Sequence, residues 1–236
     1  MTPVPERVLL HVWRVPGRQV PAAVSRLALD RRLLRRTPGL SFAKGMGTGD
    51  GRTFTVRDSD PRRWALLTTW QTISAAEGFA TSPVVLAWSR LAEESWRVDL
   101  RPLASRGRWS RQEPFGDPVP QRWDGPVAAL TRARLVLRRA AAFWRAVPPV
   151  SADLQGAPGL RLALGVGEAP VGLQGTFSLW DSASALRRFA YEQPAHVEAV
   201  RRTATDGWYA EELFARFAVL ASAGTLGGQD PAREVV

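Results

Sequence analysis

Two histidines and no cysteine limit the chemistry available to this chain of 236 residues. The lack of cysteine excludes disulfides, zinc–thiolate sites, iron–sulfur clusters and a cysteine nucleophile. His196 opens a predicted helix and shares one face of it with Val200 and Thr203, so its imidazole points inward among apolar and small neighbours. This environment suits a proximal iron ligand. A core or helix-start histidine bonded to the backbone is the alternative.

The other histidine, His11, lies in the predicted strand VLLHVW (8–13) and matches no motif, so we expect a satisfied core or edge histidine. A site with two histidines and one carboxylate would require His11 and His196 to meet in space. The chain has no GxSxG elbow, no P-loop and no HExxH motif. Hydrolase and kinase functions therefore have no support.

Two predicted strands carry polar side chains that could line a cavity. In 173–180, Gln174 and Thr176 share one face and Phe177 lies on the other. Gln174 could donate a hydrogen bond to a bound ligand; the alternative is a solvated sheet face. Arg132, in 126–136, could pair with an anionic cofactor group or polarise a bound molecule, because guanidinium is a permanent planar donor. A surface arginine is the alternative.

An internal repeat organises the elements that must position these residues. PGLSFAKG (38–45) and PGLRLALG (158–165) are each followed by a Gly-rich turn, and then by a strand that ends in tryptophan. Each of those strands leads into a helix, a second helical stretch that follows a proline, and a closing strand. The order in each half is strand, helix, strand, strand, helix, strand, which is the ferredoxin-like plan. We therefore predict an α+β fold of two fused ferredoxin-like halves, with antiparallel sheets and helices outside.

The predicted boundaries follow composition. They are a first half (1–107), a Pro- and Arg-rich linker (108–125), a ligand-bearing second half (126–226) and a disordered tail (227–236).

The N-terminus has no signal-peptide pattern, so we expect a cytoplasmic protein. The net charge of +10 comes from arginines spread along the chain without a nucleic-acid recognition module, so we expect no nucleic-acid partner. The ten tryptophans together with arginine suit peripheral contact with a membrane surface. Monomer and homodimer both remain open.

The sequence resembles the spheroidene monooxygenase family of carotenoid-modifying enzymes. The segments that carry the resemblance are LRRTPGLSFAKGMGTG (34–49), RGRWSRQEPF (106–115), GPVAALTRA (125–133), GVGEAPVGLQGTFSLW (165–180) and HVEAVRRTATDGWYAEELFARFAVL (196–220). The resemblance implies a dimeric α+β barrel fold and O2-dependent oxygenation of an apolar polyene. It also implies haem as cofactor and a ferredoxin-type electron donor. The family motif has a histidine at the position of His196.

We therefore expect a haem-dependent monooxygenase acting on an apolar polyene or secondary metabolite. His196 is the predicted iron ligand, and Gln174 and Arg132 are the predicted catalytic residues. The predicted haem-binding residues are His196, Arg132, Thr176, Phe177 and Val200. Two alternatives remain, since the barrel group holds haem enzymes of other chemistries. One is a haem enzyme with no net oxygenation, of dehydratase or isomerase type, and the other is a non-enzymatic protein that binds haem or an apolar ligand.

Overall fold

The elements of the two halves follow one another in the predicted order. The computed structural model describes residues 2–49, 58–136, 138, 151, 153–168, 173–193 and 208–233, with the backbone alone at 173 and 174. The first half contains β1 (Arg7–Arg14), a 3-10 turn (Gly17–Gln19), α1 (Val20–Leu34), β2 (Leu40–Gly49), β3 (Ser59–Trp70), α2 (Ile73–Gly78), a 3-10 turn (Phe79–Thr81), α3 (Pro83–Leu91) and β4 (Glu94–Gly107). The second half contains β5 (Val127–Leu135), β6 (Leu160–Gly167), β7 (Leu173–Trp180), α5 (Ala183–Glu192) and β8 (Tyr209–Gly224).

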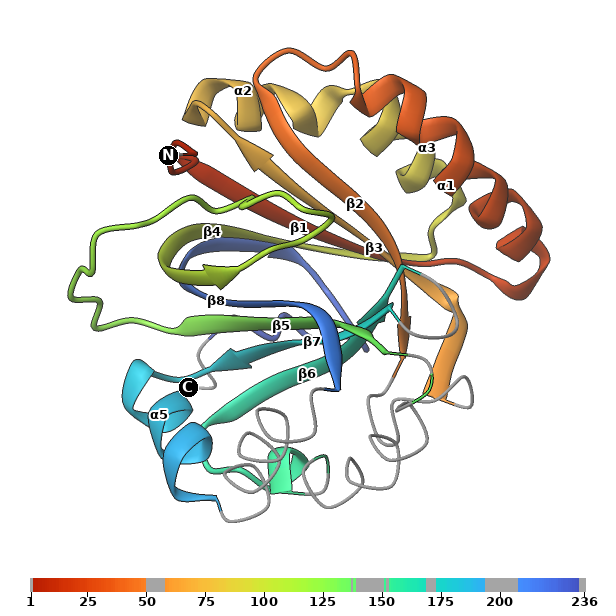
Figure 1. The fold of residues 1–236 in the computed structure, drawn as a ribbon. Coiled ribbons are helices and arrows are strands. Elements are labelled where there is room, and N and C mark those ends of the chain that lie inside the picture. Colours follow the sequence, from red (N-terminus) through yellow and green to blue (C-terminus); the bar gives the residue numbers. More distant parts are fainter. Residues whose placement is uncertain are drawn as a thin grey trace.

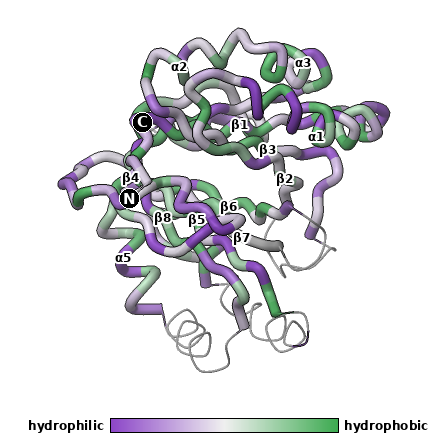
Figure 2. Tube along the Cα trace, turned by 45° about the horizontal axis from the view of Figure 1, so that its top comes forward, coloured by the Kyte–Doolittle hydropathy of each residue, from purple (hydrophilic) through white to green (hydrophobic). Residues whose placement is uncertain are grey.

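The eight described strands close into one antiparallel barrel (Figure 1). Each half contributes a sheet in ferredoxin-like order, β4-β1-β3-β2 and β8-β5-β7-β6. Two seams join the sheets: a long one between β4 and β8, and a short one between β2 and β6 at Gly47–Gly49. Figure 2 shows α1, α2 and α3 on one side of the barrel and α5 on the opposite side. The predicted α+β fold of two fused halves with outer helices is confirmed.

The barrel interior is a packed apolar core. Strand residues alternate between the two faces of each sheet, and the inner positions of both halves form one hydrophobic cluster. Its largest fully buried side chains are Trp96, Trp109, Phe115, Phe177 and Phe217. A barrel of eight strands is just wide enough for side chains to fill. None of the described helices is long and apolar enough to cross a membrane.

The internal repeat is reproduced in local hydrogen bonds. The indole of Trp70, at the end of β3, donates to Thr68 Oγ1 at 2.9 Å, and that of Trp180, at the end of β7, donates to Ser178 Oγ at 2.9 Å. The helix that follows each strand is capped by a hydroxyl, from Thr72 in the first half and Ser182 in the second. The two halves therefore share one register for their central strands and following helices.

Two segments cover the ends of the barrel. One follows β4 and was predicted to be a linker, and the other begins at Gly227 and was predicted to be a disordered tail. Trp109, just after β4, inserts its fully buried indole into the barrel core. We expected the tail from Gly227 to be disordered, but the structure holds residues 227–233 against the barrel. Asp230 accepts hydrogen bonds from Trp96 Nε1 at 3.1 Å and Ser222 Oγ at 2.6 Å. These partners come from β4 and β8, which composition alone does not reveal.

The repeated Pro-Gly-Leu turns set the approach of a helix to each sheet. Gly39 and Gly159 both have positive φ, of 74° and 83°. A Cβ on Gly39 would lie 2.6 Å from the Cβ of Ala75, and one on Gly159 would lie 2.7 Å from the Cβ of Ala185. Only glycine therefore fits these turns without strain.

We predict that Gly39→Ala and Gly159→Ala each lower the free energy of unfolding by about 2 kcal/mol or more, because left-handed backbone strain adds to the clash. Urea unfolding followed by circular dichroism measures the change. Gly78→Ala is the control: nothing lies within 4 Å of its added Cβ, so we expect little change or slight stabilisation. Losses below about 0.5 kcal/mol in both turn variants would contradict the prediction.

Candidate ligand-binding face and buried polar network

Backbone pairing defines which positions of the two sheets correspond. β1 and β3 place His11 opposite Leu66, and β5 and β7 place Thr131 opposite Thr176. Leu66 and Thr176 each lie four residues before the tryptophan that ends their strand. The outer faces of the two sheets can therefore be compared position by position.

The outer face of the first-half sheet is filled by large side chains, and that of the second half is not. The first-half residues are Leu9, His11 and Trp13 of β1 with Trp64 and Leu66 of β3. The described residues at the matching places of the second half are Ala129, Thr131, Ala133 and Thr176. These four are only half-buried by the described residues, whereas Leu9, Trp13 and Leu66 are buried. Among the described residues, the second-half sheet therefore carries a strip of small side chains on its outer face, which we call the outer-face slot.

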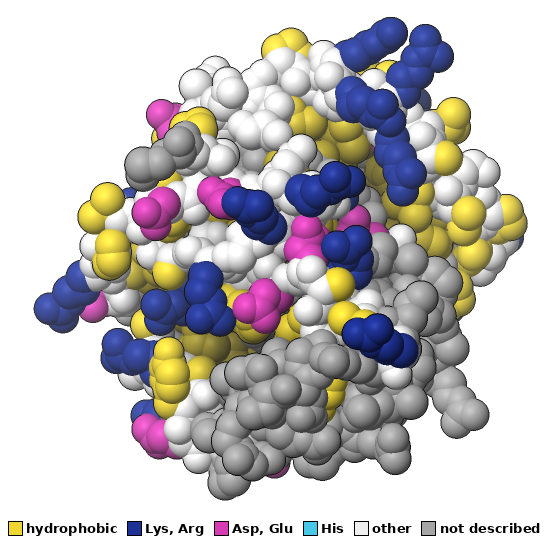
Figure 3. Space-filling view, viewed as in Figure 1, with side chains coloured by type: hydrophobic (Ala, Val, Ile, Leu, Met, Phe, Trp, Pro, Cys, Tyr) yellow, Lys and Arg dark blue, Asp and Glu magenta, His cyan; other side chains and the backbone are white. Residues whose placement is uncertain are grey.

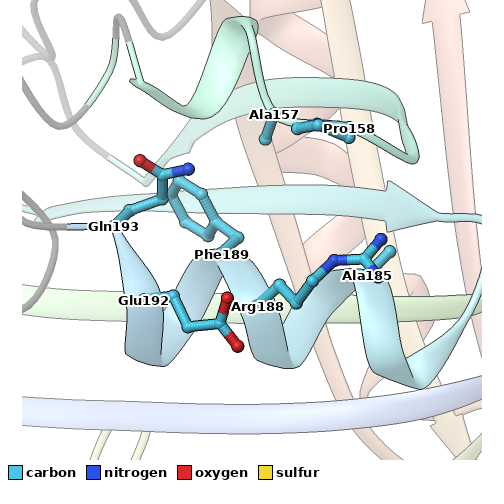
Figure 4. Close-up of a pocket in the computed structure, with 7 residues that line it drawn as sticks. All are labelled: Ala157, Pro158, Ala185, Arg188, Phe189, Glu192 and Gln193. Atoms are coloured by element: carbon cyan, nitrogen blue, oxygen red, sulfur yellow. The ribbon is translucent and has the colours of Figure 1, made fainter.

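A small cavity lies at the α5 end of this face. In Figure 4, Arg188 and Phe189 of α5 lie opposite Ala157 and Pro158, as does Gln193, the residue that follows the helix. The cavity measures about 130 Å³, below the range of roughly 300–1,000 Å³ for sites of drug-sized ligands. By itself it is too small for a cofactor, and none of Ala129, Thr131, Ala133 and Thr176 lines it.

The predicted site residues fall on two faces of the second-half sheet. Thr176 lies on the outer face with Ser178, whereas Phe177 points into the barrel and packs edge-on against Trp96 at 6.4 Å between ring centroids. Arg132 also points into the barrel. Thr176 therefore cannot share one pocket with Phe177 and Arg132, because the sheet separates them.

Three predicted residues cannot be placed fully. His196 and Val200 lie outside the described residues, so their assignment stays a prediction. The backbone of Gln174 pairs with Ala133 and Gly167, and its side chain is outside the described part. His11 is the one histidine among the described residues, and those residues contain no cluster of three potential metal ligands.

Arg132 is the centre of a buried polar network at the barrel end that Trp109 covers. Its side chain is 5% exposed and forms ion pairs with Glu168, at 3.1 Å, and with Glu211. The guanidinium also lies over the Trp109 ring, 5.7 Å from the centroid. Its two terminal nitrogens donate to the two carboxylates, whereas its Nε has no hydrogen-bond partner among the described residues. Arg132 therefore positions protein groups through its terminal nitrogens.

Glu168 joins the two halves across the short seam. Its carboxylate accepts hydrogen bonds from Lys44 Nζ of β2 at 2.8 Å and from Trp109 Nε1 at 2.6 Å. Burial alone would raise the pKa of Glu168, but the hydrogen bonds from Lys44 and Trp109 and the positive charges of Lys44 and Arg132 outweigh it and lower the pKa. Glu168 is therefore an ionised structural anchor.

Glu211 fixes the turn that carries Trp109. Ser110 and Arg111 both have positive φ, of 53° and 64°, which is uncommon for residues other than glycine. Their backbone N–H groups donate to Glu211 at 3.0 and 2.7 Å. Burial would raise the pKa of Glu211, but these bonds and the Arg132 guanidinium lower it. Lys44, Glu168 and Glu211 belong to no motif that could have placed them together, so sequence reasoning could not assemble this network.

His11 is a buried histidine, as expected, but it is not fully satisfied. Its side chain is 5% exposed, stacks on Trp13 at 5.2 Å between centroids, and its Nδ1 has no hydrogen-bond partner among the described residues. It lies at a cavity of about 260 Å³ that also borders Val85 and Arg97. Burial, reinforced by the charge of Arg97, lowers the pKa of His11 to about 3. The imidazole is therefore neutral near pH 7.

We predict that Arg132→Met lowers the free energy of unfolding by about 2 kcal/mol or more, because Glu168 and Glu211 lose a buried countercharge. Arg134→Met is the matched control. Arg134 lies on the same strand and points the same way but is exposed, so we expect a change within about 0.5 kcal/mol. Equal stability changes in the two variants, measured by urea unfolding, would contradict the role of the network.

His11 makes stability depend on pH. Between its unfolded pKa of about 6.5 and its folded pKa of about 3, the unfolded chain binds a proton that the folded chain does not, so stability falls as pH falls. We predict that His11→Leu loses about 2 kcal/mol less than the unmodified protein between about pH 7 and pH 5. Urea unfolding at both pH values measures this. Identical losses would show that His11 is not held neutral.

Comparisons with known proteins agree with this architecture. No protein-family model matches the chain. It is 35% identical over 229 residues to the spheroidene monooxygenase of Rhodobacter capsulatus, covering 94% of this chain and 93% of that protein. It is 39% identical to that of Rubrivivax gelatinosus, covering 81% and 73%. A crystal structure of an aldoxime dehydratase with butyraldoxime matches with a TM-score of 0.63 and 10% identity over 96% and 83% of the two chains, which supports the fold alone. Given its likeness to these curated relatives over nearly its whole length, the chain belongs to the spheroidene monooxygenase family.

Proposed function

We propose that this protein is a haem-dependent monooxygenase that introduces oxygen into an apolar polyene or related secondary metabolite. Relatives named spheroidene monooxygenase support an oxygenase. The reaction would use O2 and a ferredoxin-type electron donor. One oxygen atom would enter the substrate, and the other would leave as water with two electrons and two protons.

The observation that carries the haem proposal is the difference in volume between two matching sheet faces. Where the first half places Leu9 and Trp13, the second half places Ala129 and Ala133. A packed protein does not leave such space empty without cost, because voids forfeit dispersion contacts. The small side chains present therefore fit a flat apolar group laid against the outer face of the second-half sheet.

Each group of residues has a distinct part in this proposal. When bound, haem would supply the activation of O2. Ala129 and Ala133 would give its plane access to the sheet, and the hydroxyls of Thr131 and Thr176 would offer hydrogen bonds on that face. His196 would hold the iron, and Val200, one turn later on the same predicted helix, would provide apolar contact. Arg132 and Phe177 would support the sheet from inside the barrel.

Haem chemistry without net oxygenation is the second candidate. The fold shared with an aldoxime dehydratase is compatible with it. The two candidates differ in their co-reactants, since an oxygenase consumes O2 and reductant, whereas a dehydratase or isomerase consumes neither. Product formation from spheroidene under O2 with a reduced ferredoxin, and its loss under nitrogen, would support the oxygenase. Turnover that persists without O2 would favour the second candidate, and tight haem binding without any turnover would favour a binding protein.

We predict that the protein reconstituted with haem shows an intense Soret band, which His196→Ala loses while the far-ultraviolet circular dichroism is unchanged. We further predict that Ala129→Leu/Ala133→Trp, which installs the first-half side chains, weakens haem binding by more than about tenfold because it fills the slot. Absorption titration with haem measures both effects.

Arg134→Trp is the matched control for added bulk. It lies on the same strand but points to the inner side, at an exposed position, so haem binding should be unchanged. Full haem occupancy with an unaltered spectrum in the slot-filling variant would overturn the placement of haem. The same result in His196→Ala would overturn the iron ligand. No Soret band in the unmodified protein would overturn the cofactor.

A further inference from the structure

Helix α1 presents an unusual combination of side chains to solvent. Its inner face packs on the first-half sheet through Ala23 and Leu34. Away from that face it exposes Val24, Leu29 and Leu33, at 51%, 59% and 43%. Leu29 and Leu33 lie one turn apart and form a short apolar stripe that nothing in the described structure covers, whereas Val24, five residues before Leu29, lies on another side of the helix.

The charges next to this stripe all have one sign. Around the C-terminal end of α1, four exposed arginines lie within six residues: Arg31, Arg32, Arg35 and Arg36. None of the four forms an ion pair with a described carboxylate. Figure 3 shows a group of Lys or Arg side chains at the upper right, beside yellow hydrophobic side chains, in the region where Figure 1 places α1.

The one acidic residue of α1 is withdrawn from its outer face. Asp30 is 4% exposed, accepts a hydrogen bond from Trp88 Nε1 of α3 at 2.7 Å, and is ion-paired with Arg26. It joins α1 to α3 and leaves no negative charge on the outside of the helix. Cations near a helix C-terminus also favour the macrodipole, but that effect is confined to the last turn and does not explain the exposed leucines.

We propose that the outer face of α1 docks on an anionic lipid surface. The arginines would bind lipid phosphates, and Leu29 and Leu33 would enter the boundary between headgroups and acyl chains, as in interfacial amphipathic helices. The apolar stripe favours lipid over nucleic acid, whose recognition relies on phosphate contacts and base readout rather than on aliphatic side chains. The proposal rests in part on the proposed function, because an apolar polyene substrate would be dissolved in membranes.

The test is co-sedimentation of the full chain with vesicles of phosphatidylcholine, with and without phosphatidylglycerol. Neither haem nor substrate is needed, so the result is independent of the proposed oxygenase activity. We expect binding to the anionic vesicles that weakens as salt rises. Each basic residue near an anionic surface contributes on the order of fivefold. Arg31→Gln/Arg32→Gln/Arg35→Gln/Arg36→Gln should therefore weaken binding by more than about tenfold.

Two matched controls separate a local site from general charge and hydrophobicity. Arg106→Gln/Arg108→Gln/Arg122→Gln/Arg187→Gln removes the same charge from exposed positions elsewhere and should reduce binding much less. Leu29→Gln/Leu33→Gln should weaken binding at high salt, whereas Ile73→Gln/Val119→Gln, at exposed apolar positions outside α1, should not. Circular dichroism confirms that each variant is folded.

Each other outcome would overturn the proposal. Unmodified protein that stays in the supernatant with anionic vesicles excludes the surface as a lipid site. Equal losses in the two four-arginine variants would reduce the effect to net charge. Retention on duplex DNA or on an acidic ferredoxin through Arg31 and Arg32, without vesicle binding, would assign the arginines to that partner instead.

Discussion

Alternation of side chains in a closed barrel is the constraint on which the rest of this structure depends. Every strand residue points either into the barrel or toward the covering helices. The inner positions are occupied by one apolar cluster and, at one end, by the Arg132 network. The proposed haem would therefore lie outside the barrel, on the outer face of a sheet. The same alternation separates Thr176 from Phe177 and Thr131 from Arg132, although they are neighbours in sequence.

The polar network compensates for the weaker of the two seams. β4 and β8 pair along most of their length, whereas β2 and β6 pair only at their ends. At that short seam, Lys44 of β2 and Glu168 after β6 form an ion pair, and Arg132 connects Glu168 to Glu211 of β8. Buried charges hold a geometry strongly once each is paired, because breaking one pair leaves its partner uncompensated. The strained turn at Ser110 and Arg111 depends on the same Glu211.

Much of the fold could be predicted from sequence because its signals are local and occur twice. The Pro-Gly-Leu turns and strand-ending tryptophans identified the two halves. The alternation of side chains along the strand put Thr176 and Phe177 on opposite faces of the sheet. Barrel closure was expected only from the family resemblance, since the seams join strands far apart in sequence without a local signal. The network was missed for the same reason: Lys44, Glu168 and Glu211 meet only in three dimensions. The tail from Gly227 has a disordered composition, yet Asp230 finds partners on two distant strands.

The covalent link between the halves has a consequence for how such a protein can diversify. In a symmetric homodimer of single halves, one gene encodes both sheets, so a substitution that opens one outer face opens the other as well. Here Trp13 and Ala133 occupy matching positions but are encoded separately. One half can keep large side chains on its outer face and support the barrel, while the other can carry small side chains there. Fusion therefore allows the outer faces of the two halves to change independently within one barrel.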